Sequence, residues 1–335
     1  MGKMTRIAVV GTGTMAALHV EEWLHVKGCE VVALVGRTEQ HLSNLAAKYH
    51  VKGFFDLEEA LRQVEIDVVD ICVPTHLHEE VVGIACMAKK AIICEKPLAI
   101  SSALAKKMVE QCAEYQVPLY VGHVLRFSPE YVEAREQVLS GAIGKPGIMR
   151  LSRKGPYPKG RDDWYKDEAK SGGVVLDLAI HDIDWLRWTF GEVERVMAKQ
   201  IKRENLDYAL ITLRFQSGVI CHLDVSWGAK SFVSSFELAG SNGMITYQSN
   251  DHVPIVIEMF NEEREDQERV AVPSYIVRDT PLKRQLQHFM DCIENNESPI
   301  VTAMDAVSAI YVAECIIESM KSGKPVEFYK GGILN

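Results

Sequence analysis

Residues 6–16 have the sequence RIAVVGTGTMA, and this stretch decides the fold of the chain. The apolar run at 7–10 predicts a strand, and a helical pattern extends from the glycines to about Lys27. Between a strand and a helix, Gly11 permits a tight turn, and Gly13 lets a pyrophosphate approach the positive end of the helix. The turn therefore indicates dinucleotide binding, although such a turn can also bind nothing. The residues expected at the cofactor are Gly11, Thr12, Gly13, Thr14 and Met15.

Strands and helices alternate through the rest of the first 122 residues. Apolar runs predict strands at about 30–35, 68–73, 91–94 and 119–122, and helical patterns predict helices at about 39–49, 57–64, 78–89 and 102–115. This alternation is typical of an α/β domain with a doubly wound parallel sheet. We therefore expect residues 1–122 to form a dinucleotide-binding domain.

Polar residues follow two of these strands at their carboxyl ends, where open α/β sheets bind ligands. Pro74, Thr75 and His78 follow the strand at 68–73, and Glu95 and Lys96 follow the strand at 91–94. We expect all five at the cofactor, with His78 facing its nicotinamide end. The alternatives are a histidine exposed at a helix start and a solvated Glu-Lys pair.

The pattern changes after residue 122. Strands are predicted at 147–153, 193–199, 208–215, 219–227, 232–239, 244–247 and 255–259, and helices at 282–294 and 303–321. Consecutive strands without intervening helices imply an antiparallel sheet. Residues 123–335 are therefore predicted to form a second, α+β domain, and we allow the helix at 303–321 to pack back on the first domain.

A predicted helix at 174–188 carries Asp177 and His181 four residues apart, so the two lie one turn from each other. A carboxylate next to an imidazole raises the imidazole pKa and fixes its orientation, as a general base requires. A buried histidine with a structural aspartate is the alternative. We expect an apolar face made by Val174, Leu178, Trp185 and Trp188.

A long loop is predicted at 154–173, and its surroundings are basic. Residues 150–166 include six basic and two acidic residues. Arg153, Lys154 and Arg161 are therefore candidates to meet an anionic substrate group or a cofactor phosphate, and a solvated surface loop is the alternative.

Composition excludes several classes of protein. The 335 residues are 47% hydrophobic and carry a net charge of −9, which argues against nucleic acid or an anionic membrane as a partner. The eight cysteines form no C-x-x-C pair, which favours a reduced, cytoplasmic protein. The first apolar run stops at Gly11, so no signal peptide is expected. His76 and His78 would put their imidazoles on opposite sides of an extended chain, so no metal site is expected.

Taken in order, these motifs resemble the family named for glucose–fructose oxidoreductase, inositol dehydrogenase and MocA. The resemblance rests on the glycine turn, 74–78, 95–97, Arg126-Phe127, Gly172-Gly173 and 177–184. It implies a Rossmann domain followed by a domain with a large open, mostly antiparallel sheet, whose free face makes homodimers or homotetramers. The implied activity is NAD(P)-dependent oxidation, or the reverse reduction, of a secondary alcohol on a sugar or cyclitol.

The resemblance also implies which residues act. Lys96, Asp177 and His181 would form the catalytic set: His181 takes the hydroxyl proton while hydride leaves the same carbon, Asp177 orients His181, and Lys96 stabilises the developing alkoxide. Further substrate contacts are expected from His123, Arg126, Tyr157 and Trp164. Two other functions stay open, a non-enzymatic dinucleotide-binding regulator and a glycoside hydrolase that uses bound nicotinamide transiently.

The second predicted strand lacks the acidic residue that would hold a free ribose 2′-hydroxyl. It ends instead at Arg37 and Thr38, and Ala16 takes the place of the third glycine. Because a guanidinium and a hydroxyl suit a 2′-phosphate, we expect NADP to be favoured somewhat over NAD. An Arg37 side chain in solvent, or stacked on adenine, would give no preference.

Overall fold

The computed structural model describes residues 4–249 and 279–328 and divides into two compact units. The first comprises Met1–Phe127 with Asp279–Ser308, and the second comprises Ser128–Arg278 with Ala309–Asn335. Helix α10 (Ala303–Ser322) therefore contributes to both. The strand expected at 255–259 lies outside the described residues.

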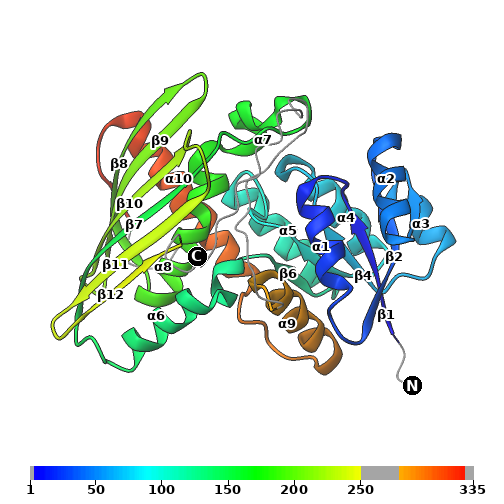
Figure 1. Cartoon of the computed structure of the whole chain (residues 1–335), viewed down its shortest axis with the longest axis horizontal. Coiled ribbons are helices and arrows are strands. Elements are labelled where there is room, and N and C mark those ends of the chain that lie inside the picture. The colour runs from blue at the N-terminus through cyan, green and yellow to red at the C-terminus, as the bar shows by residue number, and fades with distance from the viewer. Residues whose placement is uncertain (1–3, 250–278, 329–335) are drawn as a thin grey trace. The chain divides into compact units, whose positions relative to one another are not determined.

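The first unit contains a six-stranded parallel sheet with the order β3-β2-β1-β4-β5-β6 (Figure 1). Its strands are β1 (Thr5–Val10), β2 (Cys29–Val35), β3 (Lys52–Phe54), β4 (Val68–Ile71), β5 (Ala91–Cys94) and β6 (Leu119–Val121). The order reverses between β1 and β4, so the carboxyl ends of these strands border the crevice in which doubly wound sheets bind ligands. The predicted parallel fold is confirmed. Strand β3 was not predicted, because it has only three residues and two of them are exposed.

Helices flank this sheet. They are α1 (Thr14–Trp23), α2 (Glu39–Tyr49), α3 (Leu57–Gln63), α4 (His78–Met87), α5 (Ser102–Glu114) and α9 (Pro281–Asn295). Helix α1 packs on α9, and α4 packs on α5. The prediction that the first helix extends to about Lys27 was wrong: α1 ends at Trp23, and turns lead to Gly28, whose φ of +81° reverses the chain into β2.

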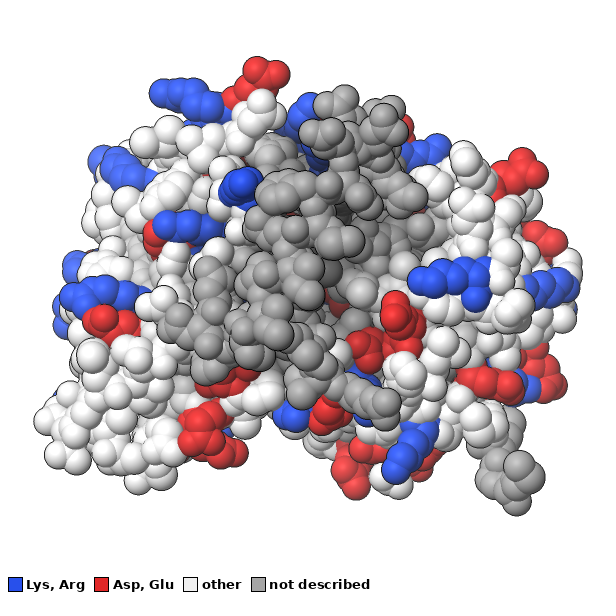
Figure 2. Space-filling model, viewed as in Figure 1, with Lys and Arg blue, Asp and Glu red and all other residues white. Residues whose placement is uncertain are grey.

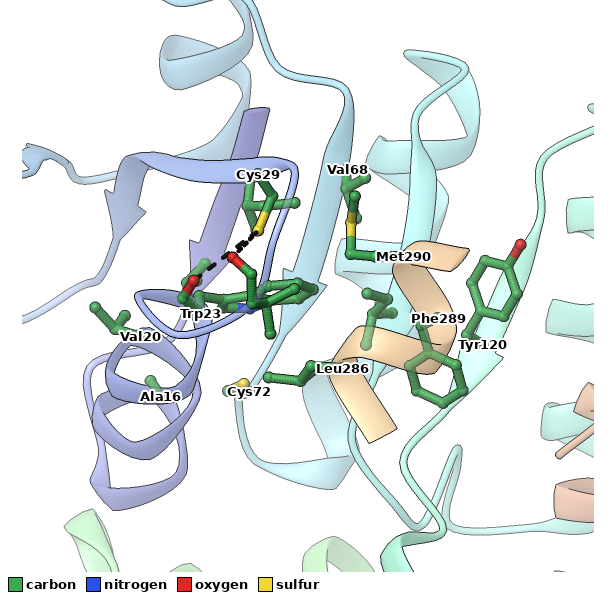
Figure 3. Close-up of a cluster of buried hydrophobic side chains, with 14 of the residues drawn as sticks. Ala16, Val20, Trp23, Cys29, Val68, Cys72, Tyr120, Leu286, Phe289 and Met290 are labelled. Carbon is green, nitrogen blue, oxygen red and sulfur yellow. Dashed lines mark hydrogen bonds between the residues drawn. The ribbon is translucent and has the colours of Figure 1, made fainter. Parts of the chain in front are cut away.

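The core of the first unit joins segments that are far apart in the sequence (Figure 3). Trp23 of α1 and Val68 of β4 share one buried cluster with Leu286 and Phe289 of α9. The Phe289 ring lies 5.2 Å from that of Tyr120. Burial of each large apolar side chain contributes about 1.5–3 kcal/mol, which fixes α9 in this unit.

The second unit contains a seven-stranded sheet with the order β12-β11-β7-β10-β9-β8-β13. The strands are β7 (Pro146–Gly155), β8 (Val193–Arg203), β9 (Leu206–Phe215), β10 (Ile220–Trp227), β11 (Val233–Gly240), β12 (Met244–Gln248) and β13 (Val326–Glu327). Among the described strands of this sheet, only β7 and β10 pair in parallel, so the predicted mostly antiparallel sheet is confirmed. Strand β13 was not predicted, since it has two residues.

The two faces of this sheet differ. One face is apolar and packs against α6 (Pro129–Leu139) and α8 (Ile180–Phe190), where Trp185 stacks on Phe236 and meets Tyr131 edge to face. Residues of opposite parity, such as Arg150, Leu210 and His222, stand on the other face and are exposed. We call this the open face.

Two local predictions in the second unit need correction. The expected loop at 154–173 contains a 3₁₀ segment, Arg161–Lys166, and a short helix, α7 (Glu168–Ser171). The expected helix at 174–188 starts with a π-helical turn, Val175–Ala179, that continues into α8. Its predicted apolar face was partly wrong, because Leu178 and Trp188 are half-buried whereas Asp182 and Asp184 are fully buried.

Candidate active site

The glycine turn joins β1 to α1. Gly11 has a φ of +133°, and a Cβ there would lie 2.5 Å from the carbonyl oxygen of Cys72, so only glycine fits. A Cβ at Gly13 would meet no described atom within 4 Å. Helix α1 begins at this point without a side-chain cap and without an acidic residue in its first turn. Its N–H groups and the positive end of its dipole therefore fit the pyrophosphate of a dinucleotide.

The end of β2 lies against this turn. A Cβ at Gly36 would overlap the Thr12 methyl group, so the two segments touch. The next residue, Arg37, has a side chain that is 65% exposed, and its Nη2 lies 3.4 Å from Oε2 of Glu80, which is 60% exposed. An exposed ion pair of this kind contributes little, so the guanidinium can exchange its partner for a phosphate. Thr38 starts α2.

Lys96 stands directly after β5 and is half-buried. The backbone N–H of Glu95 donates to the carbonyl oxygen of Ile71 at 3.0 Å, which continues the parallel ladder to the loop. The backbone N–H of Lys96 donates to Oε2 of Glu95 at 3.2 Å, and the Lys96–Pro97 peptide is cis. The lysine thus stands on a fixed backbone at the ligand-binding edge of the sheet.

His78 has its contacts inside the first unit. Nδ1 lies 3.0 Å from the carbonyl oxygen of Pro97 and 3.1 Å from that of Leu98, and Nε2 lies 2.9 Å from that of Val73. The side chain is buried, and burial lowers its pKa. His78 ties the Lys96 loop to the start of α4. Its expected contact with the nicotinamide stays a prediction, as do those of Pro74 and of the buried Thr75.

His123 and Arg126 follow β6 and are almost fully buried. The Nη1 of Arg126 donates to the carbonyl oxygen of Ile300 at 2.8 Å and to Oδ2 of Asp305 at 3.2 Å. Burial opposes the charge on Asp305, but Arg126 outweighs it and lowers the pKa of this carboxyl. Arg126 therefore connects the start of α10 to the rest of the first unit, and its expected contact with substrate stays a prediction.

In the second unit, Asp177 and His181 are half-buried in a stretch that is otherwise mostly buried. Asp177 lies within the π-helical turn and His181 in the first turn of α8. Turns of this kind are frequent at functional sites. The stretch begins at Gly172 and Gly173, both with positive φ, and a Cβ at Gly172 would overlap Leu176. The glycines thus set the direction in which this helix starts.

Two aromatic candidates lie before this helix. The Tyr157 ring meets Trp227 edge to face with centroids 5.4 Å apart, and the Trp164 ring is tilted against that of Tyr165 with centroids 3.9 Å apart. Both candidates are half-buried, so each presents part of its ring to solvent. Their contact with substrate stays a prediction.

The three basic candidates in this region have carboxylate partners. Arg153 is 4% exposed and binds Asp182 through Nε at 2.6 Å and Nη2 at 2.7 Å. Lys154 pairs with Asp224 at 2.7 Å, and Arg161 lies 3.5 Å from Asp162. Arg153 and Lys154 are therefore paired with carboxylates from other parts of the fold, whereas the exposed pair of Arg161 contributes little, and the expected contact of Arg161 with an anionic group stays a prediction.

Charged side chains of both signs are interspersed over the visible face of the described residues (Figure 2). This face shows no continuous basic surface of the kind that nucleic acids require. No helix in the described part of the chain has the length and apolar character to cross a membrane.

Comparison with known proteins decides the family. Residues 5–123 match the family model for an oxidoreductase family with an NAD-binding Rossmann fold, and residues 131–246 match that for the GFO/IDH/MocA C-terminal domain. A myo-inositol 2-dehydrogenase of Thermotoga maritima is 30% identical over 95% of this chain and 98% of its own. The chain belongs to the GFO/IDH/MocA family of oxidoreductases. The resemblance inferred from its motifs is thereby confirmed.

Other members of the GFO/IDH/MocA family support the same conclusion. A scyllo-inositol 2-dehydrogenase (NAD(+)) of Bacillus subtilis is 29% identical over 98% of this chain and 97% of its own. The crystal structure of GenD2 from gentamicin A biosynthesis, in complex with NAD, has a TM-score of 0.88 at 23% identity, over 98% of this chain and 97% of that one. The latter likeness concerns the fold alone.

Sequence reasoning missed two buried polar residues of the first unit, His19 and Asp70. Both are fully buried, and they are hydrogen-bonded to each other. The sequence could have indicated this pair, because Asp70 interrupts the apolar strand β4 and a carboxylate buried in a parallel sheet needs a hydrogen-bond partner.

Proposed function

We propose that the protein transfers hydride reversibly between a secondary alcohol of an uncharged sugar or cyclitol and NADP or NAD. The observation that carries the proposal is Lys96, held at the ligand-binding edge of a dinucleotide-binding sheet on a backbone fixed through Glu95. The names of the relatives, which include inositol 2-dehydrogenases and D-apiose dehydrogenases, support a polyol substrate. The carboxylate partners of Arg153 and Lys154 support an uncharged one.

In the proposed mechanism, Lys96, Asp177 and His181 act on the alcohol. His181 accepts the hydroxyl proton at an imidazole nitrogen, and Asp177 orients that ring from the preceding turn. Lys96 stabilises the negative charge that develops on the oxygen, a contact worth on the order of 10²–10³ in rate. The turn at 11–15 would hold the cofactor, whose nicotinamide supplies the hydride chemistry when bound. A non-enzymatic regulator would have no use for this set of groups.

We propose further that NADP is preferred over NAD, because Arg37 is exposed beside the glycine turn and no acidic residue ends β2. We also propose a cytoplasmic location, since all eight cysteines are unpaired thiols, as a reducing compartment favours.

The open face of the second sheet supports a homo-oligomer. Ile201, Leu210, Ile220 and Met244 stand on this face and are each more than a third exposed. The register places Leu210 diagonally to Ile201, and it places Ile220 in one row with Ile148 and Met244. Neighbouring exposed apolar side chains of this kind mark interaction sites. We propose that a second copy of the chain covers this face in a homodimer or homotetramer.

The test of the enzymatic function is a panel of neutral sugars, cyclitols and their phosphorylated or carboxylated derivatives, assayed with both cofactors. We expect reduction of the cofactor, followed by its absorbance, with a neutral polyol. Glycoside cleavage without net change in that absorbance would favour the hydrolase instead. A clear preference for the anionic derivatives would contradict the proposed uncharged substrate.

A further inference from the structure

His19 connects α1 to the loop that carries Lys96. Its Nδ1 lies 2.8 Å from Oδ2 of Asp70 on β4, and its Nε2 lies 3.0 Å from Oε1 of Glu95. His19 and Asp70 are fully buried, and Glu95 is 8% exposed. The three side chains form one chain of hydrogen bonds inside the first unit, away from bulk water.

The His19 ring is an imidazolium. Ionised carboxylates only accept hydrogen bonds, so a ring with a carboxylate oxygen at each nitrogen donates from both. Burial opposes this charge, but the attraction and hydrogen bond of Asp70 outweigh it and raise the pKa of His19 well above its ordinary value. Asp70 is itself fixed, because Trp23 Nε1 donates to its Oδ2 at 2.7 Å and the Cys72 thiol lies 3.8 Å from its Oδ1.

The same side chains do not suit a metal ion. The ligand atoms of His19, Asp70 and Cys72 lie within 4.8 Å of one another. A histidine ligand must offer a lone pair, however, and both nitrogens of His19 are committed as donors to carboxylates.

Glu95 connects His19 to the backbone of Lys96. One carboxylate oxygen accepts from His19, and the other accepts from the backbone N–H of Lys96 at 3.2 Å. Burial opposes ionisation of Glu95, but its hydrogen bond and attraction to His19 lower its pKa. The carboxylate thus stays charged and oriented, and the far end of the loop is held separately by His78 at Pro97 and Leu98.

Gly122 leaves the space that this arrangement needs. A Cβ at position 122 would lie 2.8 Å from Oε1 of Glu95, the oxygen that His19 binds, and 3.3 Å from Nε2 of the buried Gln285. Gly122 lies next to β6, whose backbone continues the ladder from Cys94. An added methyl group would therefore displace the Glu95 carboxylate from His19.

We propose that Asp70 and His19 are positioning residues for the dehydrogenase: they hold Glu95, which fixes the backbone on which Lys96 meets the substrate. This inference rests on the proposed function, because it requires Lys96 to act on the reacting alcohol. Neither residue touches the reacting atoms. Their effect is geometric, and a displacement of about 1 Å at a catalytic group can cost on the order of 10² in rate.

The first test uses His19→Gln and Asp70→Asn, which keep the approximate shape of the side chains and remove the charges. We expect kcat to fall about 10- to 100-fold in each, while the cofactor dissociation constant stays within about threefold, since the glycine turn is untouched. His288→Gln is the matched control. This histidine lies on α9 of the same unit, where its Nε2 accepts from the Ile300 N–H at 2.9 Å and its ring lies 5.4 Å from that of Phe127. Its loss should leave kcat within about twofold, because it has no contact with Glu95 or Lys96 among the described hydrogen bonds and ring contacts.

The second test distinguishes positioning from a general loss of structure. In the Lys96→Ala background, His19→Gln should lower kcat by less than about twofold, because the group that it positions is already gone. Gly122→Ala should reproduce the effect of His19→Gln and should not add to it, while Gly83→Ala on α4, where a Cβ lies 3.8 Å from the nearest side chain, should be neutral. Gly122→Ala decides the matter if His19→Gln does not fold.

These experiments distinguish failure of the positioning role from failure of the proposed function. Additive losses from His19→Gln and Lys96→Ala, or wild-type kcat in both His19→Gln and Gly122→Ala, would overturn the positioning role and leave the proposed function intact. Wild-type turnover in Lys96→Ala would overturn both.

Discussion

At the scale of single residues, the proposed chemistry depends on Lys96 and His181. We expect Lys96→Ala and His181→Ala to lose most turnover, on the order of 10²-fold or more, because both groups act where charge develops or a proton moves. Cofactor affinity, measured by binding isotherms, should stay within a few-fold. Turnover within threefold of wild type in either variant would contradict its catalytic assignment.

Arg37 is expected to set cofactor preference. A charge-assisted bond to a 2′-phosphate is worth roughly 1.5–3 kcal/mol, or about one to two decades of affinity. Arg37→Ala should therefore weaken NADP binding about 10- to 100-fold and leave NAD binding nearly unchanged. Arg62→Ala, an exposed arginine on α3, serves as the control. If wild type binds NAD tenfold more tightly than NADP, or if Arg37→Ala leaves NADP affinity unchanged, the role of Arg37 is wrong.

His19 and His78 should contribute to stability with opposite dependence on pH. The folded-state pKa of His19 is raised, so its contribution is fully present below about pH 6.5 and is lost as pH rises. That of His78 is lowered, so its contribution is present above about pH 6.5 and is lost as pH falls. Denaturant unfolding from pH 5.5 to 8.5 should show the destabilisation by His19→Gln shrinking with pH and that by His78→Gln growing. Parallel curves would contradict the opposite pKa shifts of the two histidines.

At the scale of elements, strand β7 carries two arginines on opposite faces. Arg153 is buried with Asp182 of α8, and its Nη2 also donates to the Tyr131 hydroxyl at 2.8 Å. Arg150 pairs with Glu237 on the exposed side. Asp182→Ala leaves a buried charge without its partner, so the free energy of unfolding should fall by about 3–5 kcal/mol, whereas Glu237→Ala should cost less than about 1 kcal/mol. Equal, small losses in denaturant unfolding would show that Arg153 is not held by this pair.

The sequence allowed most of the elements to be predicted, because their periodicity follows burial. Strands β1, β2 and β5 are short apolar runs in a sheet covered on both sides, and their positions were predicted to within about two residues. The same argument could not find β3 or β13, which are too short for any period. It also misplaced the apolar face of the helix at 174–188, because a π-helical turn changes the residue spacing and Asp182 is buried with a partner from another element.

The candidate site was predicted only in its local motifs. The glycine turn and the residues after β5 could be assigned to the cofactor site from local sequence alone, because each follows a strand of an open α/β sheet, where ligands bind. By contrast, the hydrogen bonds of His19 with Asp70 and Glu95 join three segments that lie between 25 and 76 residues apart in the sequence. No local sequence pattern predicts such contacts. The ion pairs of the basic region at 150–166 could not be predicted for the same reason, since its carboxylate partners include Asp182 and Asp224, which lie outside that region of the sequence.

At the scale of the whole molecule, the proposed assembly depends on the open face of the second sheet. Among the described strands it combines apolar side chains such as Leu210 and Ile201 with ion pairs such as Arg150–Glu237. Protein interfaces combine an apolar core with a polar rim, and this face carries side chains of both kinds. An isologous dimer would place the same residues of both copies against each other, so one substitution acts twice.

We therefore expect Leu210→Asp to shift the protein from oligomer to monomer, because it puts two carboxylates into an apolar contact that excludes water. Sedimentation velocity or light scattering at several concentrations would measure the shift. Leu139→Asp is the matched control, since Leu139 at the end of α6 is 60% exposed, close to the 54% of Leu210, but lies off the sheet. A monomeric wild type, or an oligomer that survives Leu210→Asp as well as Leu139→Asp, would show that the open face is not the interface.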